Sequence, residues 1–145
     1  MTNGISFTAA ICHKVVEAVE TQSGAIEIWG DGHQSRSFMY IDDCVKGIDL
    51  IMHCDQLIAT PINLGSSELV SINELVDKVE RIAGVKLRRS YNLAAPRGVA
   101  GRNSDNTFIE QVLNWEPRLD TGLRHPYVWI RKQYQRRMKG LRIVA

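Results

Sequence analysis

The alternation of short apolar strands with amphipathic helices constrains the fold of this 145-residue chain more than any other feature. Ile11, Val15 and Val19 recur at the helical period of 3.6 residues, whereas the run at 26–29 is typical of a short strand. The same reasoning predicts strands at 37–40, 61–64 and 85–91, and helices that begin near Ala9, Asp42, Ser71, Ser104 and Asp120. We therefore predict one domain over residues 1–145, a small mixed α/β fold with short strands and about five helices.

Capping residues set the predicted helix boundaries. Ser71 and Glu74 have the spacing of a capping box, in which each side chain accepts a hydrogen bond from the other residue's backbone. Gly84 is expected to end that helix, because glycine adopts the left-handed conformation at little cost. The side chains expected to cap two other helices are Asp42, Asp43, Ser104 and Asp105.

Composition argues against several classes of protein. Apolar residues make up 44% of the chain and charged residues 23%, which suits a folded core rather than disorder. No run approaches the roughly 20 apolar residues of a membrane span, and the first residues lack the pattern of a signal peptide. Three cysteines without Cys-x-x-Cys spacing predict neither a disulfide framework nor a metal site. We expect a cytoplasmic protein that binds neither metal nor membrane.

The charge is divided unequally along the chain. Residues 1–85 carry 5 Lys and Arg against 12 Asp and Glu, whereas residues 86–145 carry 13 against 4. The basic half suits a polyanion, either nucleic acid or the phosphates of a smaller ligand. The alternative is that the cations after residue 130 form the solvated end of a helix, where they also suit the helix dipole.

Two segments carry arginines in surroundings suited to phosphate. The run at 29–38 places Arg36 after the Gly30-Asp31-Gly32 turn, where glycines admit a ligand and a guanidinium can bind phosphate oxygens bidentately. The run at 96–106 places two arginines just before an expected helix N-terminus, which favours anions. Taken singly, each segment also fits a plain alternative, namely a hairpin with a surface arginine and an ordinary capped loop.

Together these segments resemble the C-terminal part of the extended short-chain dehydrogenase/reductase sugar-nucleotide epimerases and dehydratases, most of all the GDP-mannose 3,5-epimerases. The resemblance spans about residues 9–139, and its motifs occur in the same order. They are Trp-Gly-Asp-Gly-x-Gln-x-Arg-Ser-Phe at 29–38, Ile-Asp-x-Cys-Val-x-Gly at 41–47, Asn-Leu-Gly-Ser at 63–66, Val-Ser-x-Asn-Glu at 70–74, Gly-Arg-Asn-Ser-Asp-Asn at 101–106, Leu-x-Trp-x-Pro at 113–117, Gly-Leu-Arg at 122–124 and Trp-Ile at 129–130.

The resemblance implies that several polar residues bind a sugar nucleotide. Gln34, Ser35 and Arg36 match the family's sugar-nucleotide contact segment. Arg102 matches an arginine of the loop that contacts the diphosphate, and Arg97 lies where related epimerases place a further phosphate arginine.

Two further residues and one departure complete the implied site. Lys14 resembles a substrate-binding lysine, and Trp29 resembles a residue that packs near the nucleotide base. From the residues alone, Trp29 equally fits a core position and Lys14 an exposed helix position. The family usually carries a second arginine where this chain has Ala100, so we expect a weaker diphosphate contact.

The family's cofactor and catalytic motifs are missing from this sequence. Family members hold NAD on a Rossmann half whose Gly-x-Gly-x-x-Gly turn opens a helix, but Gly30 and Gly32 are followed by Ser35. No tyrosine is followed four residues later by a lysine. In the 3,5-epimerases a Cys and Lys pair moves protons; the Cys position precedes the matched region, and the Lys position falls near Ser6. We therefore expect no catalytic residue and no NAD bound by this chain itself.

The expected function is to bind a GDP-mannose-like sugar nucleotide as a catalytically incomplete portion of an NAD-dependent epimerase or dehydratase. Without the Rossmann half, apolar surface is exposed, so we expect a homo-oligomer or a partner chain that covers it. One alternative is an interaction or dimerisation module that docks onto an intact epimerase. Another is a basic nucleic-acid-binding module, which lacks a recognisable motif here.

Overall fold

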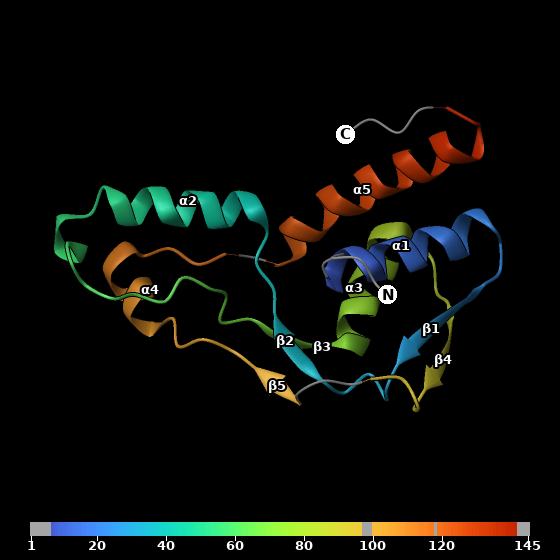
Figure 1. The fold of residues 1–145 in the computed structure, drawn as a ribbon, viewed down its shortest axis with the longest axis horizontal. Coiled ribbons are helices and arrows are strands. Elements are labelled where there is room, and N and C mark those ends of the chain that lie inside the picture. Colours follow the sequence, from blue (N-terminus) through green and yellow to red (C-terminus); the bar gives the residue numbers. More distant parts are fainter. Residues whose placement is uncertain (1–6, 97–99, 118, 142–145) are drawn as a thin grey trace.

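A computed structural model describes residues 7–96, 100–117 and 119–141. The described residues form five α-helices, one 3₁₀ turn and five short strands, which confirms the predicted mixed α/β class (Figure 1). In chain order they are α1 (Phe7–Glu20), β1 (Ala25–Trp29), β2 (Ser35–Ser37), α2 (Ile41–Met52), η1 (Asp55–Leu57), β3 (Leu69–Ser71), α3 (Ile72–Ala83), β4 (Arg88–Asn92), β5 (Gly101–Arg102), α4 (Thr107–Leu113) and α5 (Leu119–Met138).

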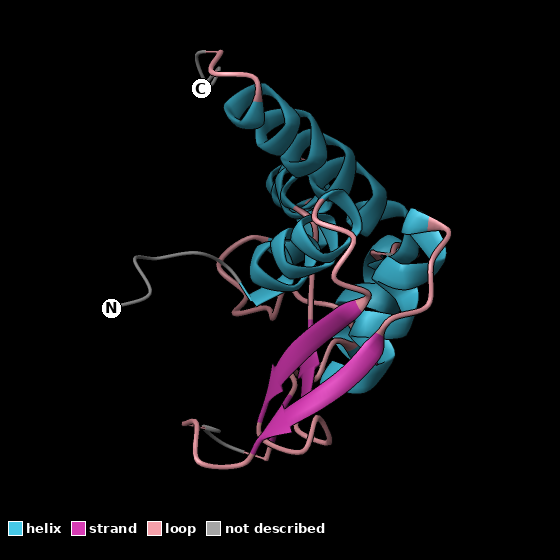
Figure 2. Ribbon diagram, turned by 90° about the vertical axis from the view of Figure 1, so that its right-hand side faces the viewer, coloured by secondary structure: helices cyan, strands magenta, loops and turns pink. Residues whose placement is uncertain are grey.

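The described strands form two small sheets. Strands β1 and β4 pair in parallel and lie side by side in Figure 2, with Ala25 opposite Arg88 and Trp29 opposite Asn92. The second sheet has the order β3-β2-β5, in which β2 is antiparallel to β3 and parallel to β5. Its register places Arg36 opposite both Val70 and Arg102.

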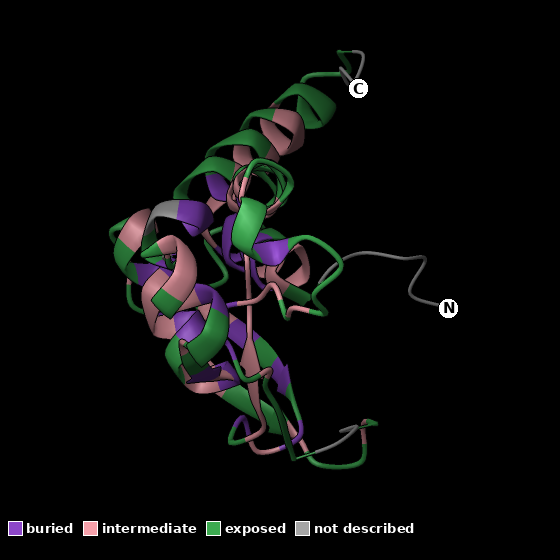
Figure 3. Cartoon of the chain, turned by 90° about the vertical axis from the view of Figure 1, so that its left-hand side faces the viewer, coloured by how far each residue is buried: buried purple, intermediate pink, exposed green. Residues whose placement is uncertain are grey.

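Helices α1, α3 and α5 enclose the hydrophobic core together with β1 and β4, and these five elements are called the core half below. Figure 3 shows buried segments on these elements. The core residues are Ile11, Cys12, Val15, Val16, Ala18, Ile26, Ile28, Val70, Ile72, Leu75, Val76, Val79, Leu87, Leu119, Leu123 and Tyr127. The helical stripe seen in the sequence at 11–19 thus faces the centre of this half.

Helix α3 has the boundaries that its capping residues predict. The Ser71 side chain accepts a hydrogen bond from the Glu74 backbone, and the Glu74 carboxylate accepts one from the Ser71 backbone. At the other end Gly84 has a φ of 70°, the left-handed conformation of a C-cap. These caps fix where α3 begins and ends, and therefore which side chains enter the core.

A buried carboxylate fastens α3 to β4. Glu80 is 2% exposed and accepts hydrogen bonds from the Leu87 backbone at 3.0 Å, from Lys86 at 2.9 Å and from Arg89 at 3.1 Å. Arg89 also contacts Asp77 at 2.5 Å. Because a buried charge is costly without partners, this cluster holds β4 in place next to α3.

Helices α2 and α4, the η1 turn and the segment 61–64 extend away from the core half, and are called the arm below (Figure 1). Of α2 only Gly47 is buried, and there a Cβ would collide with Leu64 and lie 2.9 Å from Trp115. Helix α2 therefore packs closely on one side, and its apolar residues Ile41, Val45, Ile48 and Met52 are exposed.

The predicted strands at 37–40 and 61–64 are wrong. The strand lies at Ser35–Ser37, because its backbone partners are β3 and β5, while residues 38–40 lead into α2. Segment 61–64 forms no strand, because its backbone makes no hydrogen bond with the backbone of another described residue. The segment predicted at 85–91 is a strand only from Arg88 to Asn92.

The predicted caps of α2 and α4 also need correction. The N-cap of α2 is Tyr40, which makes no side-chain cap bond, so Asp42 and Asp43 lie in the first turn and suit the helix dipole there. Helix α4 begins at Thr107 after Asn106, and Asp105 accepts a hydrogen bond from the Thr107 backbone at 3.0 Å. The prediction of one domain over residues 1–145 stays a prediction.

Candidate functional site

The pairing of β2 with β5 brings two of the predicted arginines together. Arg36 lies directly opposite Arg102 on neighbouring parallel strands, so both side chains leave the sheet on the same face. Arg102 is exposed, and Arg36 is half-buried and donates to the Ser35 carbonyl at 2.6 Å. The chain segments that carry these residues are more than 60 positions apart, so only the fold makes them neighbours.

A glycine turn delivers β2 to this position. Gly30 and Gly32 have φ of 78° and 75°, which an L side chain rarely adopts. A Cβ on Gly32 would also collide with the side chain of Asn73. The Asn73 backbone donates to the Gly32 carbonyl at 3.1 Å, which ties the turn to the first residues of α3.

Gln34 and Ser35 hold this turn and strand in place. The Gln34 amide donates to the Trp29 carbonyl at 2.9 Å across the turn, and the buried Gln34 Oε1 makes no hydrogen bond within the described part of the chain. The Ser35 backbone donates to the Ala100 carbonyl at 2.8 Å. Ala100 therefore takes part in this pairing through its backbone.

Lys14 and Trp29 meet on the other side of the turn. The Lys14 ammonium lies 5.6 Å from the Trp29 ring centroid and donates to the Glu27 carbonyl at 2.8 Å. The Trp29 indole donates to the Glu27 carboxylate at 3.0 Å, which fixes the ring. The ring is 40% exposed and borders a cavity of about 170 Å³ with Phe7, so it forms an accessible aromatic surface beside a cation.

A cavity of about 420 Å³ adjoins Arg102. It is lined by Ser37, Phe38, Met39, Leu64, Gly65, Ser66, Arg102, Asn103 and Ser104. Gly65 has no room for a side chain because a Cβ would collide with the Ser104 hydroxyl. Below it, the buried Asn106 accepts from Ser104 at 2.9 Å and so fixes the loop that follows Arg102.

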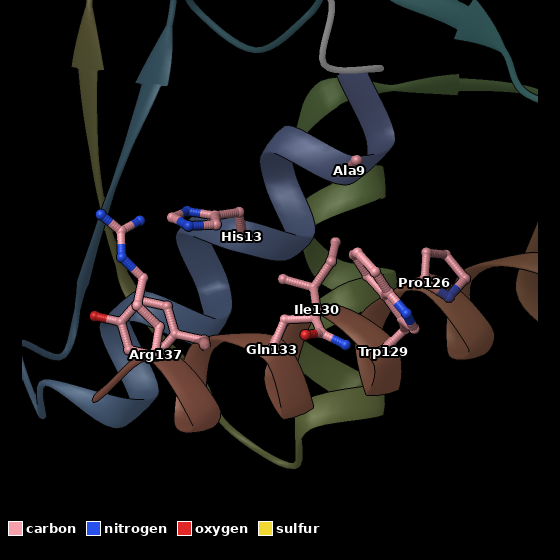
Figure 4. A pocket seen from close by; sticks show the side chains of 8 residues that line it. Ala9, His13, Pro126, Trp129, Ile130, Gln133 and Arg137 are labelled. Atoms are coloured by element: carbon pink, nitrogen blue, oxygen red, sulfur yellow. The ribbon is translucent and has the colours of Figure 1, made fainter. Parts of the chain in front are cut away.

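A larger groove of about 460 Å³ lies between α1 and α5, away from the predicted residues. In Figure 4 His13 projects from α1, while Trp129 and Ile130 project from α5. His13 meets the Tyr134 ring edge to face at 5.8 Å. The lining holds one arginine, Arg137, and no carboxylate, so it presents apolar surface rather than paired groups for proton transfer.

Part of the basic half of the chain is neutralised internally. Arg131 contacts Glu20 at 2.8 Å, and Arg89 and Lys86 contact Glu80. Hydrogen bonding from Arg131 lowers the pKa of Glu20, and that from Lys86 lowers the pKa of Asp77. The excess of positive charge in the sequence is therefore smaller on the surface than its residue count indicates.

The structure brings six of the seven predicted residues to the β1–β2 turn and the β2–β5 pair. The seventh, Arg97, lies outside the described residues. Their roles in binding stay predictions. Sequence reasoning missed Glu27, which holds both Lys14 and Trp29; its position two residues before Trp29, on the same face of a strand, was the available signal. It also missed Asn106, whose burial no local pattern indicates.

A model of the NAD dependent epimerase/dehydratase family matches residues 3–65. The chain is 42% identical over 130 residues to GDP-mannose 3,5-epimerase of Arabidopsis thaliana and 40% identical to GDP-mannose 3,5-epimerase 1 of Oryza sativa subsp. japonica. The chain is thus similar in sequence to the NAD-dependent epimerase/dehydratase family.

Solved structures agree with this family. UDP-glucuronic acid 4-epimerase of Bacillus cereus, solved in complex with NAD, superposes with a TM-score of 0.65 and 26% identity over 86% of this chain and 40% of its own. UDP-glucose 4-epimerase of Thermotoga maritima, at 24% identity and a TM-score of 0.70, shares the fold over 92% of this chain and 41% of its own.

The chain matches only part of the length of its relatives. It aligns over 88% of its own length but spans about a third of the length of the Arabidopsis and rice enzymes. The fold is accordingly that of a portion of such an enzyme, equivalent to the C-terminal part that the sequence predicts.

The described residues do not fit NAD, the cofactor expected for the full-length family. The only close glycine pair of the predicted type, Gly30 and Gly32, lies in a turn that leads from β1 into β2. An NAD-binding turn instead opens a helix, whose N-terminus receives the pyrophosphate. No step of chemistry is therefore assigned through NAD to this chain. In the described part of the chain no group of His, Cys, Asp and Glu could hold a metal ion, and no helix could span a membrane.

Proposed function

We propose that this chain forms the phosphate-binding portion of a sugar-nucleotide site, in which Arg36 and Arg102 hold the diphosphate. The observation that carries this proposal is the register of β2 and β5, which places the two arginines opposite each other. Neighbouring strands lie about 4.8 Å apart, so the two arginine side chains extend from backbone positions that are close together.

Two adjacent guanidinium groups favour a dianionic ligand for electrostatic reasons. Like charges on one face of a sheet repel each other, and a bound anion converts that repulsion into attraction. Each guanidinium has a planar fork of donors that matches two phosphate oxygens, and a diphosphate offers one phosphate to each fork. A diphosphate ester is therefore the small ligand that best suits the pair Arg36 and Arg102.

Groups on both sides of the arginines suit the other parts of a sugar nucleotide. The Trp29 ring, held by Glu27 and flanked by Lys14, supplies a surface on which a nucleotide base can stack. The cavity beside Arg102 offers the polar groups of Asn103 and Ser104. Gln34 positions the other groups, because its hydrogen bond to the Trp29 carbonyl fixes the turn between Trp29 and the arginine pair.

The relatives support a nucleoside diphosphate sugar as the ligand class. Their names specify GDP-mannose in the plant enzymes and UDP-glucuronate in the enzyme of Thermodesulfobacterium geofontis. These enzymes differ in base and in sugar but share the diphosphate. The phosphate contact is thus the part of the site that this chain is best placed to provide, and the choice of nucleotide depends on residues around Trp29.

We further propose that the chain does not catalyse epimerisation by itself. Of its cysteines, Cys12 has no exposed surface, and burial raises the pKa of its thiol to about 12, so it is a poor proton donor or acceptor at neutral pH. None of its tyrosines is followed four residues later by lysine. Its contribution to a reaction is to bind and orient the sugar nucleotide.

Calorimetric titration tests the phosphate site. We expect GDP-mannose to bind the wild-type chain with a Kd below about 1 mM, and NAD to give no heat of binding at the same concentration. Arg102→Ala should weaken GDP-mannose binding by about tenfold or more, because one charge-assisted contact is lost. Arg88→Ala is the matched control, since Arg88 is an exposed arginine on β4, outside the β2–β5 pair.

Two results would contradict this function. Absence of GDP-mannose binding at millimolar concentration would remove the sugar-nucleotide site from this chain. Equal weakening by Arg88→Ala and Arg102→Ala would show that the ligand responds to overall charge, which is the behaviour of a general polyanion-binding surface. In that case binding would also fall steeply with added salt.

A further inference from the structure

The groove between α1 and α5 has an apolar lining and the size of a small-molecule site. Its volume is about 460 Å³, and pockets that hold small molecules measure about 300–1,000 Å³. Four of its lining residues are apolar and come from both helices: Ala9, Pro126, Trp129 and Ile130. The Trp129 side chain is 52% exposed. A large aromatic side chain exposed within a hollow is typical of a surface that binds a ligand, and the proposed sugar-nucleotide site uses none of these residues.

One end of this groove carries a cation. In Figure 4 the side chains of His13 and Arg137 lie at one end, whereas Trp129 and Pro126 lie at the other. Arg137 is exposed, and its guanidinium makes no ion pair and no hydrogen bond with any residue that the structure describes. Glu17 approaches His13 at 4.0 Å but does not line the groove. A guanidinium in this setting favours an anion, above all a carboxylate, whose two oxygens match its planar fork.

The dimensions of the groove decide what kind of molecule fits. Residues 126–137 of α5 rise by about 16 Å along the helix axis. A strip of that length and of one helix diameter, about 10 Å, covers less than about 200 Å². A stable protein–protein interface buries about 800 Å² on each partner. The groove is therefore too small to carry such an interface by itself, and it suits a slender small molecule.

We propose that the groove between α1 and α5 binds an unbranched apolar carboxylate of the fatty-acid class. The hydrocarbon chain lies along Pro126, Trp129 and Ile130, and the carboxylate reaches the Arg137 guanidinium. Each methylene group that leaves water adds to the binding free energy, because the hydration of apolar surface is unfavourable. The single cation at one end sets the direction in which the ligand lies.

Calorimetric titration with dodecanoate tests the site, because this fatty acid in extended form is similar in length to the groove. We expect it to bind the wild-type chain with a Kd below about 1 mM. Hexanoate should bind at least about tenfold more weakly, because it leaves much of the apolar lining uncovered. Dodecyltrimethylammonium has the same hydrocarbon chain with the opposite charge, so it should also bind at least about tenfold more weakly. Circular dichroism at the same concentrations verifies that the chain stays folded.

Two variants that each remove one cation localise the carboxylate. Arg137→Gln removes the charge at the end of the groove and should weaken dodecanoate binding by about tenfold or more. Lys139→Gln removes an equal charge two positions further along the chain, but Lys139 is exposed and does not line the groove. We expect that control to change the Kd by less than about twofold, because solvent screens its charge. Arg137→Gln should not weaken the binding of dodecyltrimethylammonium.

Two neighbouring residues of α5 localise the hydrocarbon chain. Trp129 and Val128 are 52% and 43% exposed, but of the two only Trp129 lines the groove. Trp129→Ala should weaken dodecanoate binding by about tenfold or more, whereas Val128→Ala should leave it unchanged. Arg102→Ala should weaken the binding of GDP-mannose but not that of dodecanoate. The two proposed sites thus give separate readouts, and either can fail while the other stands.

Each of the following results would overturn the proposal. One is the absence of dodecanoate binding at about 1 mM. Another is equal weakening by a groove variant and its control, either Arg137→Gln with Lys139→Gln or Trp129→Ala with Val128→Ala. A third is loss of the helical circular dichroism signal at the concentrations that release heat, which would show unfolding by a detergent. A fourth is a dimer, detected by sedimentation, that Trp129→Ala abolishes and dodecanoate does not displace; this would assign the groove to a second copy of the chain.

Discussion

The core half and the arm contain helices of similar pattern, yet only the core half buries them within this chain. Helices α2 and α3 are both 12 residues long and amphipathic. Helix α3 buries five residues, among them Leu75 and Val76, whereas α2 buries only Gly47. Because the free energy of burial grows with the apolar area removed from water, the two helices contribute unequally to stability. An amphipathic pattern thus does not by itself determine how much of a helix's apolar face is buried within the described part of the chain.

The ion pairs follow the same division. Ion pairs join different elements of the core half, as in Arg131 with Glu20 and Arg89 with Glu80. In the arm, the pair of His53 with Asp49 lies within one stretch of chain at a spacing of four residues. The core half is therefore joined by both packing and charge, and we expect it to govern the unfolding of the whole chain.

Truncation of one buried and one exposed apolar side chain should show most clearly how differently the core half and the arm contribute to stability. Leu75→Ala removes a side chain with no exposed surface, so it should lower the free energy of unfolding by about 2–5 kcal/mol. Ile48→Ala removes a side chain that is 46% exposed, and the loss should be less than about 1 kcal/mol. Urea unfolding followed by circular dichroism measures both. Similar losses would show that the arm is as tightly packed as the core half.

Two of the left-handed helix ends provide a smaller test. Gly84 ends α3 with a φ of 70°, and a Cβ there meets nothing within 4 Å, so Gly84→Ala costs only the backbone conformation, about 1 kcal/mol. Asn114 ends α4 with a φ of 47°, where glycine would be less strained. Asn114→Gly should change the urea midpoint by far less than Gly84→Ala, because α4 is in the arm. A shift of similar size in the two variants would place α4 in the same cooperative unit as α3.

Local signals predicted what depends on local chemistry. The α3 helix followed from its capping box and Gly84, and α1 from its apolar period, because these boundaries are set by neighbouring residues. The prediction of a strand at 61–64 failed for the opposite reason. Its apolar residues favour a strand, but a strand also requires a backbone partner, and none of the described residues provides one.

Prediction of the candidate site from the sequence was limited in the same way, because its arrangement depends on contacts between distant residues. Sequence motifs selected Arg36 and Arg102 separately, but their pairing depends on β2 lying parallel to β5 across more than 60 residues. Glu27 was missed although it fixes both Lys14 and Trp29. Its carbonyl accepts from Lys14 on α1 and its carboxylate accepts from Trp29 on β1, and only the fold brings α1 next to β1. Residue types indicated phosphate chemistry, and the fold supplied the arrangement.

Acid should weaken the core half slightly through its ion pairs. Hydrogen bonds from Lys86 and Arg89 lower the pKa of Asp77 in the folded chain. A lowered pKa means that the carboxylate stabilises the fold fully above its unfolded pKa of roughly 4, and that this contribution is lost as the pH falls below that value. Because the Asp77 side chain is 45% exposed, solvent screens the pair and we expect a contribution of less than about 1 kcal/mol.

Two variants relate this pH dependence to the comparison. Asp77→Asn should reduce the acid-induced loss of stability between about pH 5 and pH 3, measured as the urea midpoint at each pH. Asp105, whose pKa is lowered by the hydrogen bond from the Thr107 backbone, is the control next to α4 of the arm. Asparagine at 105 can still accept that bond, and α4 contributes little to the core, so Asp105→Asn should leave the profile almost unchanged. If both variants flattened the profile equally, protonation in the arm would be coupled to unfolding of the core half, and the two regions would form one cooperative unit.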